Sequence, residues 1–246
     1  MSVPASTSLR FLLLQVRNAD DPMRDHERLA FARALAIQPD DCDTVDLLST
    51  RPSSTQLDTS DVVLLGGSGD YSATGEGEWL DRSLDVLREL VQRNQPTFAS
   101  CWGFQAMARA MGGTVVNNPD TAEVGTHQLF VTQAGRNDPV FGSLGQSFPA
   151  QMGHEDCVSV LPRGTTLLAF SERNTHQAYR VDDAPIYCTQ FHPELTRTDL
   201  HQRVKAYPQY IERITGQTPG EFIATLEETP GAEALLQRFV ATVFAG

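Results

Sequence analysis

Long apolar runs are missing from this chain of 246 residues, although 40% of its residues are hydrophobic. A membrane-spanning helix needs about 18 or more apolar residues in succession, and no segment approaches that length. The N-terminal Met-Ser-Val-Pro-Ala-Ser-Thr-Ser carries no basic side chain, and the apolar run at residues 11–14 is too short for a signal peptide. We therefore expect a soluble, cytoplasmic protein with no membrane partner.

Cysteine and basic residues are also scarce, and each shortage excludes a kind of partner. The four cysteines lack the close pairs of a zinc site, and a reducing compartment would keep them as free thiols. Lysine and arginine number 19 against 31 acidic residues, which gives a formal net charge of −12. Nucleic-acid surfaces need clustered Lys and Arg. We expect neither a metal ion, nor another cofactor, nor a nucleic-acid partner.

Nucleotide-binding loops are absent as well. The chain contains neither a Ser-Gly-Gly-x-Asp-Ser loop nor a Gly-x-x-x-x-Gly-Lys-Ser/Thr loop, so it has no motif for using ATP. It also has no internal repeat and no low-complexity linker. A length of 246 residues suits one large α/β domain.

The hydrophobic pattern alternates between short apolar runs and amphipathic segments, which predicts an α/β fold. Glycine, asparagine, aspartate and proline dominate the turns after residue 114, where short strands predict antiparallel additions to the sheet. The predicted strands are residues 9–15, 44–48, 61–65, 97–100, 129–132, 166–170, 177–181 and 186–190, and the predicted helices are residues 25–36, 79–92 and 102–111.

The C-terminal part of the chain reads differently. Residues 196–246 are mainly helical in pattern, and three prolines, Pro208, Pro219 and Pro230, divide them into pieces. A closing helix is expected at residues 232–244. The sequence therefore predicts an α/β domain over residues 1–195 and a helical extension over residues 196–246, packed on the same domain.

Cys101 lies where a predicted strand meets a predicted helix. A nucleophile on such a sharp turn needs small residues two positions before and after it, and Ala99 and Gly103 stand there. The helix N-terminus favours a thiolate and can hold an oxyanion. The other cysteines lack this context, because Cys157 and Cys188 adjoin apolar residues and Cys42 lies in an acidic turn. Cys101 is the candidate nucleophile.

A thiolate nucleophile also needs a base and a group that orients the base. His192 and Glu194 follow a predicted strand, and their spacing of two in an extended segment directs both side chains to one side. We expect the carboxylate to fix the imidazole tautomer. A metal hydrolase that uses His154 and Glu155 with this pair is a weaker alternative, because nothing specifies its ligand geometry.

Three segments, in this order, resemble the class I (triad-type) glutamine amidotransferase family. They are Gly-Gly-Ser-Gly at residues 66–69, Ser-Cys-Trp-Gly-Phe-Gln at residues 100–105 and Gln-Phe-His-Pro-Glu at residues 190–194, with supporting matches at residues 152–156 and 177–180. The resemblance extends over most of residues 9–195 and looks most like the glutaminase portion of GMP synthase, in stand-alone form. It implies a flavodoxin-like fold, with a mostly parallel central sheet flanked by helices.

The resemblance implies a reaction. In such an enzyme Cys101 would attack the side-chain amide of L-glutamine, His192 would pass a proton to the leaving ammonia, and Glu194 would orient His192. Water would then release glutamate from the thioester. A separate synthetase or another acceptor enzyme would receive the ammonia.

The resemblance also implies the residues around the nucleophile. The backbone N–H groups of Gly67 and Trp102 would form the oxyanion hole. Gln105 would contact the α-amino acid end of the substrate, and backbone groups near Gly153 and His154 would complete that pocket. For the His154 side chain we expect a structural hydrogen bond.

Two positions depart from the family pattern. Ala99 stands where the family usually has glycine, and Ser68 stands where the family usually has proline after its two glycines. Alanine is still small, so we expect the turn to form. The loss of proline removes a rigid element from the oxyanion loop.

Two other functions remain open. A γ-glutamyl hydrolase that acts on larger compounds would need room beyond the leaving nitrogen. A catalytically silent binding or regulatory protein would fit less well, because Cys101 and its two partners are intact. Residues 196–246 would either cover the site or form an interface, and Tyr207, Tyr210 and Phe222 are available for contact or for packing.

Overall fold

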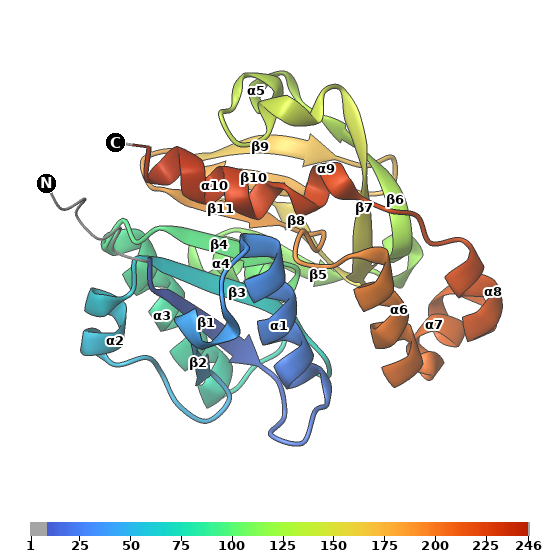
Figure 1. Ribbon diagram of the computed structural model, residues 1–246, viewed down its shortest axis with the longest axis horizontal. Coiled ribbons are helices and arrows are strands. Elements are labelled where there is room, and N and C mark those ends of the chain that lie inside the picture. The colour runs from blue at the N-terminus through green and yellow to red at the C-terminus, as the bar shows by residue number, and fades with distance from the viewer. Residues whose placement is uncertain (1–8, 246) are drawn as a thin grey trace, which may run out of the picture.

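The computed structural model describes residues 9–245, so the N-terminal octapeptide discussed above lies outside the described residues. Within this range the strands form one nine-stranded sheet and one two-stranded sheet, and helices lie on both faces of the larger sheet (Figure 1). No helix within residues 9–245 is long and apolar enough to cross a membrane.

Half of the large sheet is parallel. Apart from β2 at the edge of the sheet, its strands are buried along nearly their whole length, as expected where helices cover both faces. The order β2-β1-β3-β4-β11 is the flavodoxin-like order, which confirms the predicted fold class. These strands are β1 (Phe11–Val16), β2 (Cys42–Asp46), β3 (Val62–Ser68), β4 (Thr97–Ser100) and β11 (Ile186–Thr189).

The other half of the large sheet is antiparallel, as the turn-rich pattern after residue 114 predicts. It continues the sheet in the order β10-β9-β6-β7, while β5 and β8 pair separately. These strands are β5 (Thr114–Asn117), β6 (Glu123–Val131), β7 (Ser147–His154), β8 (Asp156–Val160), β9 (Thr165–Phe170) and β10 (Ala178–Val181).

Several strands differ from the sequence prediction. Strand β6 is more than twice as long as the predicted residues 129–132, and β5, β7 and β8 were not predicted. Gly125 inside β6 and Pro149 inside β7 interrupt the alternation, and long-range pairing between these two strands overrides it. The acidic turn predicted at Cys42 is also wrong, because Cys42 is the buried first residue of β2 and pairs with Phe11 of β1.

Two layers of helices cover the sheet. One apolar cluster joins α1 (Met23–Leu35) and α10 (Leu235–Val243) to one face, and another joins α2 (Ser54–Thr59), α3 (Glu78–Gln92) and α4 (Trp102–Ala110) to the opposite face. The helix α5 (Gln133–Asn137) packs on β9. Short 3-10 turns occur at η1 (Pro39–Asp41), η2 (Pro119–Thr121) and η3 (Gly142–Leu144).

The C-terminal helices form two groups. Helices α6 (Arg197–Ala206), α7 (Pro208–Thr215) and α8 (Pro219–Ala224) share their own apolar cluster beside α1 and β6, and we call them the cap (Figure 1). The chain then returns to the sheet through α9 (Pro230–Glu233) and α10. The three prolines each occupy the first position of a helix, which suits their fixed φ, so they separate the helices as predicted.

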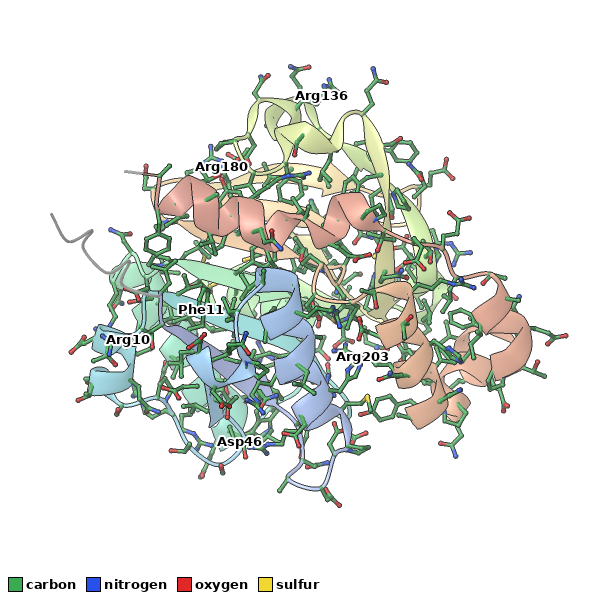
Figure 2. The ribbon with its side chains drawn as sticks, in the orientation of Figure 1. Arg10, Phe11, Asp46, Arg136, Arg180 and Arg203 are labelled. Atoms are coloured by element: carbon green, nitrogen blue, oxygen red, sulfur yellow. The ribbon has the colours of Figure 1, made fainter. Side chains whose placement is uncertain are left out.

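After β1, the chain adds β2 on one side of it and then β3 on the other side. The connections that follow these strands therefore diverge, and a crevice is expected at the carboxyl ends of β1 and β3. The cap stands at this edge of the sheet, and Figure 2 shows Arg203 of α6 facing α1. Ligands of open α/β sheets bind at such a switch point. The topology therefore indicates where a functional site is expected.

Candidate active site

Cys101 forms the turn between β4 and α4. Its backbone angles, φ 52° and ψ −105°, lie outside the regions that non-glycine residues normally adopt. Its N–H donates to the carbonyl of Thr189 at 2.8 Å, which holds the turn against the sheet. Strained backbone of this kind costs of order 1–3 kcal/mol and is concentrated at functional sites.

The small residues around Cys101 have a steric reason. A Cβ atom on Gly103 would lie 2.6 Å from Cβ of Leu65 and 3.2 Å from Cβ of Ala99. Position 103 therefore has no room for a side chain. Because Gly103 itself carries none, the methyl group of Ala99 is accommodated, which explains why the alanine that departs from the family pattern fits this turn.

Gly67 and Trp102 flank the nucleophile. A Cβ atom on Gly67 would lie 3.0 Å from Cε1 of His192 and 3.6 Å from Sγ of Cys101, so the backbone of β3 lies directly against both side chains. Trp102 is the first residue of α4, where N–H groups have no acceptor within the helix. The structure thus brings both predicted oxyanion-hole residues to the nucleophile.

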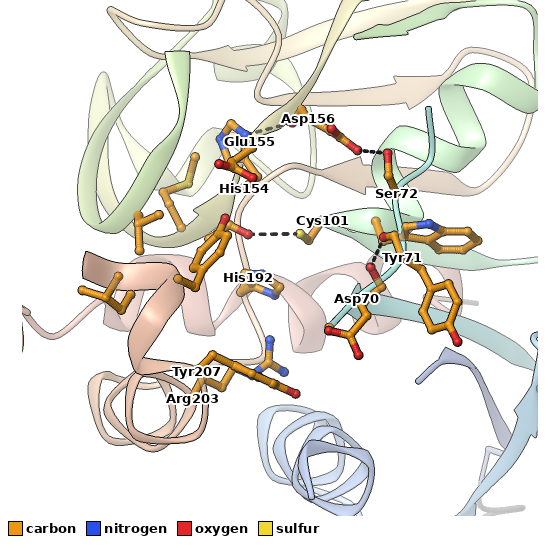
Figure 3. Close-up of a pocket in the computed structure, with 18 of the residues that line it drawn as sticks. Asp70, Tyr71, Ser72, Cys101, His154, Glu155, Asp156, His192, Arg203 and Tyr207 are labelled. Atoms are coloured by element: carbon orange, nitrogen blue, oxygen red, sulfur yellow. Dashed lines mark hydrogen bonds between the residues drawn. The ribbon is translucent and has the colours of Figure 1, made fainter. Parts of the chain in front are cut away.

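His192 and Glu194 follow β11 and form a buried pair. Nδ1 of His192 lies 2.6 Å from Oε1 of Glu194, and the backbone N–H of His192 donates to the carbonyl of Gln151 at 2.9 Å. The imidazole lies beside Cys101 in Figure 3. The other carboxylate oxygen of Glu194, Oε2, has no hydrogen-bond partner among the described residues.

The charges of this pair support each other. Burial opposes a positive charge on His192, but the carboxylate of Glu194 and the neighbouring Cys101 outweigh it and raise the pKa of His192 to about 9. Burial likewise raises the pKa of Glu194, yet the charges of His192 and Arg203 hold it below its usual value. An imidazolium next to a sulfur is the arrangement that stabilises a thiolate.

The other three thiols have surroundings that keep them protonated. Burial raises the pKa of Cys42 and of Cys188 to about 12 in each case. Burial also raises the pKa of Cys157. Among the cysteines, Cys101 is the one that lines the cavity.

Gln105 and Gly153 lie on one side of the nucleophile. Nε2 of Gln105 donates to the carbonyl of Asp156 at 2.9 Å and to Oε1 of Gln190 at 3.1 Å, and the side chain is buried. The carbonyl of Gly153 lies 3.7 Å from Sγ of Cys101, on which it acts as an acceptor. Two of the three predicted substrate-binding residues, Gln105 and Gly153, therefore line the cavity around Cys101, as does the third, His154.

His154 is held by the protein on both ring nitrogens. Nδ1 contacts the carbonyl of Asp156 at 3.0 Å and Nε2 contacts Oε2 of Glu123 at 3.3 Å, and the ring is buried. The side chain, at the end of β7, thus links the first residue of β6 to the first residue of β8. In the described part of the chain, no group of three His, Cys, Asp or Glu residues has an arrangement that could hold a metal ion.

A cavity of about 550 Å³ opens above Cys101, with walls from the sheet edge and from the cap (Figure 3). Tyr207 and Tyr210 line it, whereas Phe222 packs inside the cap, where a Cβ atom on Gly125 would lie 3.0 Å from its ring. Residues that sequence reasoning missed also line the cavity, and no local motif marks them: Arg17, Tyr71, Ser72, Leu200, Arg203, Val204 and Ile211.

The cap is fastened on both sides of the cavity. The hydroxyl of Tyr207 donates to Oδ1 of Asp21 at 2.7 Å, after β1. On the other side Nη2 of Arg213 donates to Oε2 of Glu155 at 3.0 Å, between β7 and β8. These contacts join segments that are far apart in sequence, so only the folded chain assembles this wall.

The fold and the site together define an α/β protein with a cysteine at a strand–helix turn beside a histidine–carboxylate pair. The family description "Glutamine amidotransferase class-I" matches residues 34–206. The chain belongs to the class I glutamine amidotransferase family.

Similar curated proteins agree with this family. GMP synthase [glutamine-hydrolyzing] of Streptomyces avermitilis is 31% identical over 171 residues, which cover 70% of this chain and 31% of that protein. Gamma-glutamyl peptidase 3 of Arabidopsis thaliana is 28% identical over 158 residues, which cover 62% of each chain. The chain spans less than a third of the length of the GMP synthases that it matches.

Solved structures share the fold over nearly the whole chain. A glutamine amidotransferase from Thermotoga maritima has a TM-score of 0.77 at 19% identity and covers 96% of this chain and 98% of its own. A glutamine amidotransferase from Methylobacillus flagellatus has a TM-score of 0.73 at 20% identity, and the match covers 95% of each chain. These likenesses extend the fold agreement into the C-terminal helices.

Proposed function

We propose that this chain hydrolyses the side-chain amide of L-glutamine through a thioester on Cys101, giving glutamate and ammonia. The observation that carries the proposal is the arrangement of Cys101, His192 and Glu194. The carboxylate of Glu194 contacts the imidazole of His192 at 2.6 Å, and that imidazole lies beside the strained turn at Cys101. Family membership supports the same chemistry.

The reaction follows from the proton positions. The thiolate of Cys101 attacks the amide carbon, and the proton on His192 passes to the amide nitrogen as the carbon–nitrogen bond breaks. Ammonia leaves and a glutamyl thioester remains. Water then attacks the thioester, His192 takes one of its protons, and glutamate departs from a regenerated thiolate. Glu194 keeps the imidazole oriented and stabilises its charge throughout.

The tetrahedral intermediates need donors for their negative oxygen. The backbone N–H groups of Gly67 and Trp102 are the proposed donors, and each such donor typically contributes about 3 kcal/mol to the transition state. Their contact with Cys101 and the helix N-terminus at Trp102 support this role. Gln105, Gly153 and His154 border the proposed place of the α-amino acid end of glutamine.

We further propose that the ammonia is delivered to a separate acceptor enzyme. The GMP synthases named above are described as glutamine-hydrolysing, and this chain matches 31% of the Streptomyces avermitilis protein. Within its 246 residues the chain has no motif for activating an acceptor with ATP. An acceptor activity would therefore reside elsewhere.

A γ-glutamyl hydrolase is the second candidate, and the size of the cavity favours it. A volume of about 550 Å³ lies in the range that accommodates a whole drug-sized ligand, which exceeds the needs of one amino acid. The match to Gamma-glutamyl peptidase 3 also supports this substrate class. The two candidates share every catalytic step and differ in the amine that leaves.

Labelling with 6-diazo-5-oxonorleucine, read by intact mass and peptide mapping, tests the mechanism together with an ammonia assay. We expect a single label on Cys101 that excess glutamine prevents, and ammonia release from glutamine. The Cys157→Ser variant is the matched control and should be labelled normally. Labelling at another cysteine would exclude Cys101 as the nucleophile, and a labelled protein with no turnover of any γ-glutamyl amide would indicate a silent binding protein.

A further inference from the structure

An arginine of the cap lines the cavity, and part of its guanidinium has no hydrogen-bond partner among residues 9–245. Arg203 in α6 is 9% exposed and lines the cavity. Its Nε and Nη2 atoms are buried and have no hydrogen-bond partner among residues 9–245. A buried cation with unpaired donors is costly, because its water has been removed and nothing replaces it. Such a group indicates a missing acceptor.

The acidic neighbours of Arg203 already have closer partners. Its Nη2 lies 3.9 Å from Oε1 of Glu194 and 4.0 Å from Oε1 of Glu27, too far for hydrogen bonds. His192 contacts Glu194 at 2.6 Å, and Arg17 donates to Glu27 at 3.2 Å. The two carboxylates therefore attract Arg203 from a distance but accept no hydrogen bond from it, and the positive charge of Arg17 lies nearby.

The rest of the cap wall suits an organic molecule better than ammonia. Most of its surface is apolar or aromatic, formed by Leu200, Val204, Tyr207, Tyr210 and Ile211, and the polar remainder is Gln209 and Arg213, of which Arg213 pairs with Glu155. Ammonia needs no apolar surface and no cation. Because Arg213 is already paired with Glu155, the wall combines an apolar surface with one cation that has no hydrogen-bonded partner among the described residues. Such a wall fits a leaving group that has an apolar body and one negative charge.

The two ends of the cavity lie on opposite sides of the reacting groups. Figure 3 shows Asp156 on one side of Cys101 and His192, and Arg203 with Tyr207 on the other. In the proposed mechanism His192 protonates the nitrogen that leaves. We therefore infer that the leaving amine lies beside His192, toward the end of the cavity that holds Arg203 and Tyr207.

We propose that Arg203 forms a subsite for the carboxylate of the leaving amine, and that the preferred substrates are γ-glutamyl amino acids with a free α-carboxylate and an apolar side chain. This inference rests on the proposed thioester chemistry. The thiolate attacks the γ-carbonyl carbon, the bond to the amino acid nitrogen breaks, and that nitrogen takes the proton of His192. Water then releases glutamate as before. A guanidinium is a strong donor to a carboxylate, and the accessible donor of Arg203 is Nη1, which forms no hydrogen bond among residues 9–245 and is not one of its fully buried atoms.

The test compares kcat/KM for three substrates of the intact chain: γ-glutamyl-valine, γ-glutamyl-valinamide and glutamine. The first two differ only in the charge that Arg203 would bind. We expect γ-glutamyl-valine to exceed the valinamide by about 10- to 100-fold, the worth of a hydrogen bond to a charged group. Equal values for these two substrates would overturn the subsite.

Variants then assign the preference to the residue. In Arg203→Gln the preference for the free carboxylate should fall to about threefold or less, and Arg203→Lys should retain part of it, because an ammonium keeps the positive charge but not the geometry of the guanidinium. Lys205→Gln, which removes an exposed charge from the same helix, is the matched control and should keep the full preference. Retention of the full preference in Arg203→Gln would overturn the assignment.

The same measurements distinguish a structural role. If Arg203 serves only to keep Glu194 ionised, its replacement lowers kcat for all three substrates by one factor and leaves their ratios unchanged, which would overturn the proposal. Failure of the proposed function itself gives a different result, because then none of the three substrates is hydrolysed and 6-diazo-5-oxonorleucine does not label Cys101.

Discussion

The Glu194→Gln substitution tests the electrostatics of the site directly. The pKa of His192 is raised to about 9 from an ordinary value of 6.5, and the negative charge of Glu194 is the first of the causes that raise it, ahead of Cys101. At pH 7.5 a histidine with a pKa near 9 is about 97% protonated, whereas one near 6.5 is about 9% protonated. Loss of the carboxylate therefore removes most of the imidazolium that stabilises the thiolate.

The magnitude follows from the same contacts. The charge of Glu194 is the first of the contributions that raise the pKa of His192, and each pKa unit lost with this carboxylate corresponds to about 1.4 kcal/mol. Because the folded-state pKa lies above 6.5, this pair stabilises the fold fully below pH 6.5, and the contribution is lost as pH rises through about 9. At pH 7.5 we expect kcat/KM to fall by about tenfold or more, yet to remain above that of a variant without Cys101.

The assay is NMR of ¹³C-labelled histidine from pH 5 to 10, with Cys101→Ser as background so that the thiolate does not contribute. In that background His192 should titrate above 6.5, and addition of Glu194→Gln should bring it below 6.5, since burial alone then acts. Asp70→Asn removes another carboxylate from the same cavity and is the matched control. An unchanged His192 titration in the Glu194→Gln variant would refute the reasoning.

Two other substitutions separate chemistry from packing. Cys101→Ala should abolish glutamine turnover while the circular dichroism and melting temperature stay native, whereas Cys157→Ser should be nearly silent; full activity in the first would exclude the mechanism. Gly103→Ala places a methyl group 2.6 Å from Cβ of Leu65 and should lower the free energy of unfolding by about 1–3 kcal/mol in urea titrations. Gly220→Ala, which has no atom within 4 Å of its new Cβ, is the control for Gly103→Ala, and equal stability of the two would contradict the steric argument.

Local chemistry made the parallel half of the fold predictable. Buried strands such as β1 and β3 consist largely of apolar runs, which sequence patterns detect. The turn at Cys101 is marked in the sequence by Gly103, the position where the structure has no room for a side chain. The antiparallel half was less readable. Strands β6 and β7 contain Gly125 and Pro149, and pairing between them, rather than local preference, decides their length.

The sequence by itself determined the nucleophile candidate, its two partners and the family, because these depend on short motifs with fixed spacing. Only the tertiary structure decided what surrounds them. No sequence motif marks Arg203 as a functional residue. It becomes a candidate because α6 packs against α1, which brings the guanidinium to within 4.0 Å of Glu27 and Glu194. Contacts of this kind join residues that are far apart in the chain, so no local pattern records them, and the substrate preference proposed here depends on them.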